Sequence, residues 1–137
     1  MKFNLKKILT TAGLLAAAAF TVFPVLAHHS FSAEFDAKKP VKLEGTVVKM
    51  EWVNPHSWLH LEVAKPDGTK ELWMVEGGSP GVMFRAGWNK NSLPAGTRVT
   101  VIGSAAKDGS LRANSRSIEF PDGRKLDTGS SQGKSAE

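Results

Sequence analysis

Apolar and polar residues alternate along the middle of the chain with the period of two that is typical of half-buried β-strands. Gly, Pro, Asn and Asp, which favour turns, interrupt the alternation at intervals. The pattern predicts five strands, over Val41–Trp52, Ser57–Ala64, Thr69–Glu76, Arg98–Ala106 and Leu111–Phe120. We therefore expect an all-β domain with short strands.

The first of these strands changes face part of the way along. Leu43 and Val47 occupy one parity, whereas Val48, Met50 and Trp52 occupy the other. A strand that changes parity in this way contains an extra residue or is strongly curved. The sequence therefore predicts a β-bulge or a strong curvature of the strand at Val47–Val48.

One short helix is predicted between the third and fourth strands, over Ser79–Ala86. Ser79 is a favoured N-cap, Pro80 suits the first helical position, and Gly87 suits the position after the end. Three strands, a helix and two strands is the element order of the five-stranded OB-fold barrel. We therefore expect residues 41–126 to form an OB-like barrel. An immunoglobulin-like sandwich is the alternative, but it requires more strands.

The segments on either side of the predicted barrel lack the alternation. Residues 28–40 show no clear period and are predicted to form an N-terminal arm that Phe31 and Phe35 attach to the barrel. Residues 127–137 are rich in Gly, Ser and polar residues, which predicts a disordered tail.

Residues 1–27 have the three parts of a secretory signal peptide. Three lysines and no acid precede the apolar run Ile8–Phe23, and Val25 and Ala27 stand at positions −3 and −1 of the expected cleavage site. We expect cleavage after Ala27, and hence a bacterial periplasmic or secreted protein without stable membrane insertion. An uncleaved membrane anchor is the alternative, for which the apolar run is somewhat short.

Composition narrows the choice of partners. The 137 residues suit one domain, and removal of residues 1–27 lowers the formal net charge from +5 to +2. So small an excess of positive charge gives no reason to expect nucleic acid as a partner. Cysteine is absent, which excludes disulfides, thiolate metal sites and cysteine nucleophiles.

Six short motifs lie along residues 28–126. They are His28-His29-Ser30-Phe31, Glu34-Phe35-Asp36, Gly45-Thr46-Val47, Trp52-Val53-Asn54-Pro55-His56, Gly87-Trp88 and Asp122-Gly123-Arg124-Lys125-Leu126. Together they resemble a family of small exported bacterial proteins that is a domain of unknown function. The resemblance implies export and a compact β-rich domain, and it implies no activity.

The histidines suggest a metal site. Cleavage after Ala27 would make His28 the N-terminal residue, and an α-amine with a pKa of about 7.7–8.0 can chelate a metal together with its own imidazole. Cu(II) favours such nitrogen ligands. We therefore expect copper as the cofactor and His28, His29 and His56 as its ligands, with His29 or His56 completing a site of the histidine-brace type. Cleavage one residue earlier would give an Ala-His-His N-terminus, which also favours Cu(II). The alternative to a metal site is that His28 and His29 are simply exposed and mobile and bind no metal.

The tryptophans suggest a second kind of site. Trp52 and Trp58 flank the turn at Asn54-Pro55-His56, and with Asn54 and Trp88 they are the predicted ligand-binding residues, for a sugar or a peptide. The alternative is that the tryptophans fill a small core. His60 is expected on the surface beside Trp58.

From these features we expect a binding or accessory domain without catalysis that binds copper. Its partner would be an unidentified periplasmic protein or a small ligand. The sequence contains no nucleophile elbow, phosphate-binding loop or His-Glu-x-x-His motif. An envelope module that recognises peptides or glycans through its tryptophans is the first alternative. A small copper-dependent oxidoreductase is the second.

Overall fold

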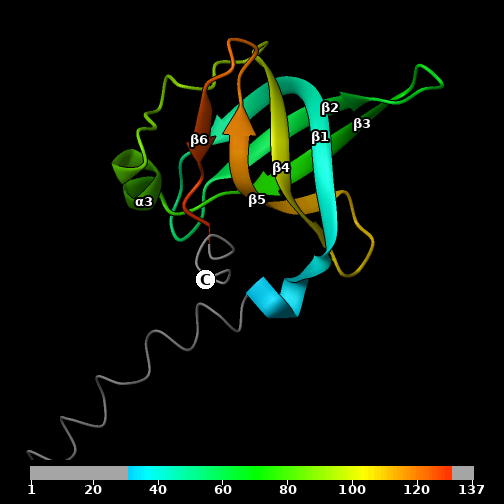
Figure 1. Cartoon of the computed structure of the whole chain (residues 1–137), viewed down its shortest axis with the longest axis horizontal. Helices are drawn as coiled ribbons and strands as arrows, with labels where there is room; N and C mark the ends of the chain where they lie inside the picture. The colour runs from blue at the N-terminus through cyan, green and yellow to red at the C-terminus, as the bar shows by residue number, and fades with distance from the viewer. Residues whose placement is uncertain (1–30, 131–137) are drawn as a thin grey trace, which may run out of the picture. The chain divides into compact units, whose positions relative to one another are not determined.

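A computed structural model describes residues 31–130 of the chain, and Figure 1 labels their main elements. In chain order these are β1 (Phe35–Glu51), β2 (Trp58–Ala64), β3 (Lys70–Glu76), α3 (Pro80–Arg85), β4 (Arg98–Ala106), β5 (Arg112–Glu119) and β6 (Lys125–Asp127). The predicted signal peptide, His28 and His29 lie outside the described residues, as do residues 131–137 of the predicted tail.

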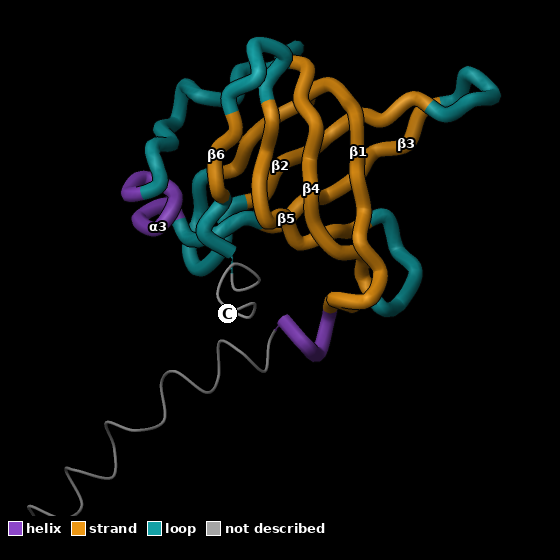
Figure 2. Tube along the Cα trace, in the orientation of Figure 1, coloured by secondary structure: helices purple, strands orange, loops and turns teal. Residues whose placement is uncertain are grey.

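The strands form one sheet that closes on itself. Its order is β3-β2-β1-β4-β5-β6, and β3 also pairs with β5, so that β1 to β5 form a ring (Figure 2). The closing pair is parallel and joins Met74–Glu76 to Arg112–Asn114, whereas the other pairs are antiparallel. The predicted mostly β fold, with a helix between the third and fourth strands, is confirmed. The sixth strand was not predicted.

Alternate residues of the ring point inward and form the core. Leu61 and Val101 are fully buried, and Leu59 and Val75 are almost so, which confirms the predicted inner face of the second strand. Each such side chain contributes about 1.5–3 kcal/mol when it leaves water. Met83 of α3 packs into the same cluster, so the helix closes one side of the core.

The bulge predicted in the first strand is present. The register between β1 and β2 shifts between Val47 and Lys49. Val48 is the extra residue, and its side chain is exposed whereas that of Val47 is buried. The shift lets β1 contribute to the core on both sides of the bulge.

The predicted helix is confirmed with its cap. The Ser79 hydroxyl accepts a hydrogen bond of 3.3 Å from the Val82 amide, and Pro80 opens the helix. Residues 31–34 are also helical, so the expectation of a single helix was wrong. None of the helices within residues 31–130 has the length and apolar character needed to cross a membrane.

The predicted N-terminal arm is partly a strand. Phe35 begins β1 and pairs with Ala106 of β4. The register then shifts between Phe35 and Pro40, so the polar residues between them do not alternate between the two faces of the sheet. That irregularity explains why the sequence showed no period over residues 35–40.

The disordered tail was predicted to begin at residue 127, but the ordered chain continues beyond this position. Lys125–Asp127 form β6, and Thr128 is fully buried. The Thr128 hydroxyl donates a hydrogen bond of 2.6 Å to the carbonyl oxygen of Ser115, so a polar residue is buried there with its partner. A search for apolar alternation cannot detect a strand held in this way.

Candidate functional site

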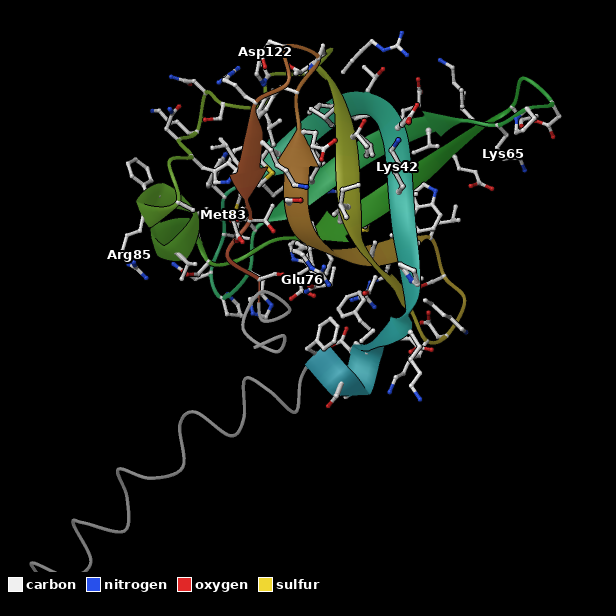
Figure 3. The ribbon with its side chains drawn as sticks, in the orientation of Figure 1. Lys42, Lys65, Glu76, Met83, Arg85 and Asp122 are labelled. Atoms are coloured by element: carbon white, nitrogen blue, oxygen red, sulfur yellow. The ribbon has the colours of Figure 1, made fainter. Side chains whose placement is uncertain are left out.

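A buried carboxylate stands where the ring closes. Glu76 is the last residue of β3 and only 6% exposed, and Figure 3 labels it at the end of that strand. The strand registers place it opposite Trp58 of β2 and Asn114 of β5. The Asn114 amide nitrogen lies 3.5 Å from the carboxylate, and the Ser115 hydroxyl donates to the Glu76 carbonyl at 3.0 Å. Because a carboxylate is rarely buried without partners, this position is a candidate site.

His56 is the main partner of this carboxylate. Its Nδ1 forms an ion pair with Glu76 Oε1, and its side chain is 40% exposed. Two backbone hydrogen bonds, each of 2.9 Å, hold the two segments together: Ser57 donates to Gly78, and Gly77 donates to Ser57. The chain after β3 thereby fixes the turn that carries His56. No described residue hydrogen-bonds to Nε2 of His56, so in the neutral ring with its proton on Nδ1 this nitrogen has a lone pair for another partner.

Arg112 of β5 joins the N-terminal residues to the same place. Its guanidinium forms a 2.8 Å ion pair with Glu34. The same group lies 5.7 Å from the ring centroid of Phe35 and 5.4 Å from that of Trp58, distances at which cations and aromatic faces attract. Phe31 stacks on Phe35 at 5.9 Å. The segment 31–35 therefore lies against the closing strands, beside Trp58. We call the group Glu34, His56, Trp58, Glu76, Arg112 and Asn114 the seam cluster.

Burial raises the pKa of Glu76 above the ordinary value of a glutamate. The positive charge of protonated His56 and the Asn114 hydrogen bond act in the opposite direction. Glu34 adds to the rise, and Arg112 reduces it. The carboxylate thus depends on its neighbours to remain charged, and it is suited to hold the proton on Nδ1 of His56.

Two of the residues predicted from sequence enter the seam cluster, His56 and Trp58. Asn54 lies nearby in the chain, in the exposed turn. Trp52 is half-buried and packs against the core, and its indole nitrogen is buried with no hydrogen-bond partner among the described residues. The Asn-Pro-His turn therefore borders the seam cluster, but its aromatic rings do not form an open platform.

Two expectations from sequence need correction. Trp88 is 1% exposed, and its indole N–H donates to the Asp127 carbonyl at 2.7 Å, so it fills the core instead of presenting a surface for a ligand. His60 is also buried, with Nε2 3.2 Å from the Glu51 carboxylate. Alternation placed His60 on the face of β2 opposite the core, but its side chain is buried there beside Glu51.

Sequence reasoning missed most of the seam cluster. Glu34, Glu76, Arg112 and Asn114 were not among the predicted site residues. The available indication was a glutamate that ends an apolar strand directly before Gly77-Gly78. Its contact with His56 depends on strand register, which alternation alone does not give.

A metal ion would need ligands from outside the described part of the chain. Within residues 31–130, no three His, Asp or Glu side chains come together in a group that could hold a metal. His56 can supply one nitrogen there, and Glu76 can orient it.

A shallow cavity of about 230 Å³ lies on another part of the ring and shares no residue with the seam cluster. Charged side chains of both signs line it, from Glu44, Arg98 and Glu119. The mixture of charges favours no particular ligand.

Comparisons with known proteins give a family and nothing further. The model of DUF6152, described as a family of unknown function, matches residues 14–115. No curated protein and no solved structure matches the chain. The resemblance to a family of unknown function, expected from the sequence motifs, is thereby confirmed.

Proposed function

Because the chain belongs to the DUF6152 family, whose function is unknown, we propose its function from the seam cluster and the sequence. We propose that it is an exported binding or accessory module without catalytic activity, and that it binds copper. The ligands would be the mature N-terminal histidines and His56.

The observation that carries this proposal is the pairing of His56 with buried Glu76. Histidines that bind metals commonly donate their other ring N–H to a carboxylate, which fixes the tautomer and the orientation of the ring. Glu76 is suited to this role toward Nδ1, which leaves Nε2 as the metal-binding nitrogen. The partly exposed ring of His56 agrees with a ligand that is added from outside.

The remaining nitrogens would come from the start of the mature chain. His28 precedes Phe31 by three residues, and three extended residues span at most about 11 Å. The segment 31–35 is held next to Trp58 by Arg112, and Trp58 is opposite Glu76 in the sheet. In this proposal the α-amine and ring of His28, with or without His29, supply the nitrogens that join His56 on the ion.

The chemistry of this donor set favours copper. Amine and imidazole nitrogens without thiolate suit Cu(II). Export to the periplasm, or secretion, follows from the pattern of residues 1–27. Recognition of a peptide or glycan is the weaker alternative, because Trp88 is in the core and Arg112 lies over Trp58.

A Cu(II) titration of the protein that begins at His28 tests the proposal. Addition of one residue before His28, or His28→Ala, should abolish tight binding. His56→Ala should weaken binding, whereas His60→Ala is a matched control that should change it little, because His60 lies in the sheet beside Glu51. Equal affinity of the mature and the extended protein would refute the copper site, and a metal-free ligand that quenches tryptophan fluorescence would favour the alternative.

A further inference from the structure

We propose that a second copy of the chain binds along the part of β3 that the ring leaves unpaired, Lys70–Trp73, and that the two edges pair as antiparallel strands about a two-fold axis at Glu71. We call residues 70–73 the free edge. The free edge shares no residue with the seam cluster, and the inference does not depend on copper binding.

The ring closes along only part of β3. The pairing with β5 begins at Met74, and within residues 31–130 no strand covers the free edge on that side. The Met74 amide donates away from β2, to the Leu111 carbonyl at 3.0 Å. Backbone groups of an antiparallel strand face its two neighbours in alternation. The N–H and C=O groups of Lys70 and Leu72 therefore face outward, where no described residue pairs with them.

The free edge lacks the features that usually prevent strands from pairing. Natural edges are blunted by bulges, by proline or by lysines that extend over the edge. The register between β2 and β3 runs without a shift, and Lys70 Nζ lies 2.7 Å from the Glu62 carboxylate on the neighbouring strand. Leu72 and Met74, on one face of β3, are 52% and 36% exposed. Because the β2–β3 hairpin extends beyond the rest of the ring (Figure 1), a partner can reach this edge.

One two-fold register uses all of the outward backbone groups. With the axis at Glu71, Leu72 of each copy stands opposite Lys70 of the other, and each of these pairs exchanges both of its backbone hydrogen bonds. With the axis at Leu72, Lys70 would meet Met74, whose amide is already bonded to the chain before β5. With the axis at Lys70, Leu72 would meet Gly68, whose amide is already used within the hairpin turn.

The side chains favour a second copy over a strand of opposite charge. Lys70 and Glu71 are each paired within the chain, with Glu62 and with Lys65 at 3.4 Å, so the edge offers no unpaired charge to select such a strand. In the register centred on Glu71, the Leu72 side chains of the two copies are diagonal neighbours, which is within reach of long side chains. The exposed leucine thus contacts its own counterpart.

The same register places the two Glu71 carboxylates opposite each other, which weakens pairing. Lys65 of each chain and the Trp73 indole, which donates to Glu71 at 3.3 Å, offset this repulsion. An interface of two such short edges is smaller than the ~1,200–2,000 Å² of stable complexes. We therefore expect a weak dimer, with a Kd on the order of 0.1–1 mM.

Sedimentation of the protein that begins at His28 tests the interface, with a chelator present so that metal cannot join the histidines of two copies. Leu72→Pro removes the outward N–H and leaves the bonds to β2 in place, so it should raise the Kd at least about tenfold. Phe84→Lys is the matched control, because Phe84 is an exposed apolar side chain on α3 that lies outside the free edge. It should dimerise like the wild type, and thermal unfolding reports on the fold of each variant.

A charge exchange tests the register. Glu71→Lys should dimerise no better than the wild type, because like charges still meet at the axis. A mixture of Glu71→Lys with the wild type places opposite charges there and should associate at least about threefold more tightly than the wild type alone. With isotope-labelled wild type and unlabelled Glu71→Lys, the amide signals of Lys70 and Leu72 should shift most.

A wild type that stays monomeric up to about 1 mM would overturn the inference, whether the edge is empty or binds another protein. Equal dimerisation by the wild type and by folded Leu72→Pro would also overturn it, as would a dimer that only Phe84→Lys weakens. A mixture that associates no more tightly than the wild type would overturn the pairing about Glu71. If Leu72→Pro does not fold, Leu72→Lys decides by the same comparison, since it places a charge within the paired edge.

Discussion

At the scale of the residue, Glu76 links the stability of the fold to its proposed function. A carboxylate that is 6% exposed is costly to ionise, and burial raises its pKa. An apolar residue would pack there without that cost. Its contact with His56 gives a reason for the carboxylate, because it can hold the ring of a metal ligand in one orientation.

The raised pKa of Glu76 predicts how stability depends on pH. The folded protein binds this proton more tightly than the unfolded chain, so the contribution is present below the unfolded pKa and is lost as the pH rises through the folded pKa. The free energy of unfolding of the wild type, minus that of Glu76→Gln, should therefore fall from acid pH toward neutrality. Urea denaturation of both metal-free proteins at several pH values measures it.

Subtracting the free energy of unfolding of Glu76→Gln from that of the wild type cancels the contribution of the other acidic residues to the pH dependence. Asp67, Asp108 and Asp122 have pKa values lowered by hydrogen bonds to Thr69, Ser110 and Arg124, and they favour folding as the pH rises in both proteins. A difference that increased with pH would contradict the prediction, since it would mean that His56 and Arg112 more than compensate for burial.

At the scale of the element, local patterns predicted what local physics determines. The bulge at Val47–Val48, the Ser79 cap and the inner face of β2 all follow from parity or from side chains close in sequence. The helical turn at 31–34, the early start of β1 and the strand β6 did not follow, because contacts between distant segments hold them. Thr128, which hydrogen-bonds to Ser115, is an example.

Thr128→Val tests how β6 is held. Valine has a similar shape, but it leaves the buried Ser115 carbonyl without the hydroxyl donor. We expect a loss of about 1–3 kcal/mol in the free energy of unfolding, measured in urea. Thr97→Val is the matched control: its hydroxyl donates to Pro94 on the exposed surface, where water can replace it. Equal losses in the two variants would contradict the prediction, because they would show that burying the Thr128 hydrogen bond adds nothing to the free energy of unfolding.

At the scale of the whole molecule, the closing pair of strands explains why candidate residues from four regions meet. Glu34 precedes β1, His56 lies before β2, Glu76 ends β3, and Arg112 begins β5. The sequence placed His56 in a turn, but only the β3–β5 pairing explains how this turn comes near Arg112 and Glu34. Register across a closed sheet is a property of the fold, and no single stretch of sequence contains it.

The same closure predicts how copper would affect the entire domain. A ligand that binds only the folded protein stabilises it by an amount that depends on its concentration relative to Kd, about 2.7 kcal/mol at a hundredfold excess. Cu(II) should therefore raise the free energy of unfolding of the mature protein by about this amount and should leave the N-terminally extended protein nearly unchanged. Because His56 contacts Glu76 at the end of β3, the slower hydrogen exchange should include the β3–β5 pair, where the Met74 amide donates to Leu111. Protection confined to the chain terminus, with no change in unfolding, would mean that the histidines bind the ion without His56 and that the seam cluster takes no part.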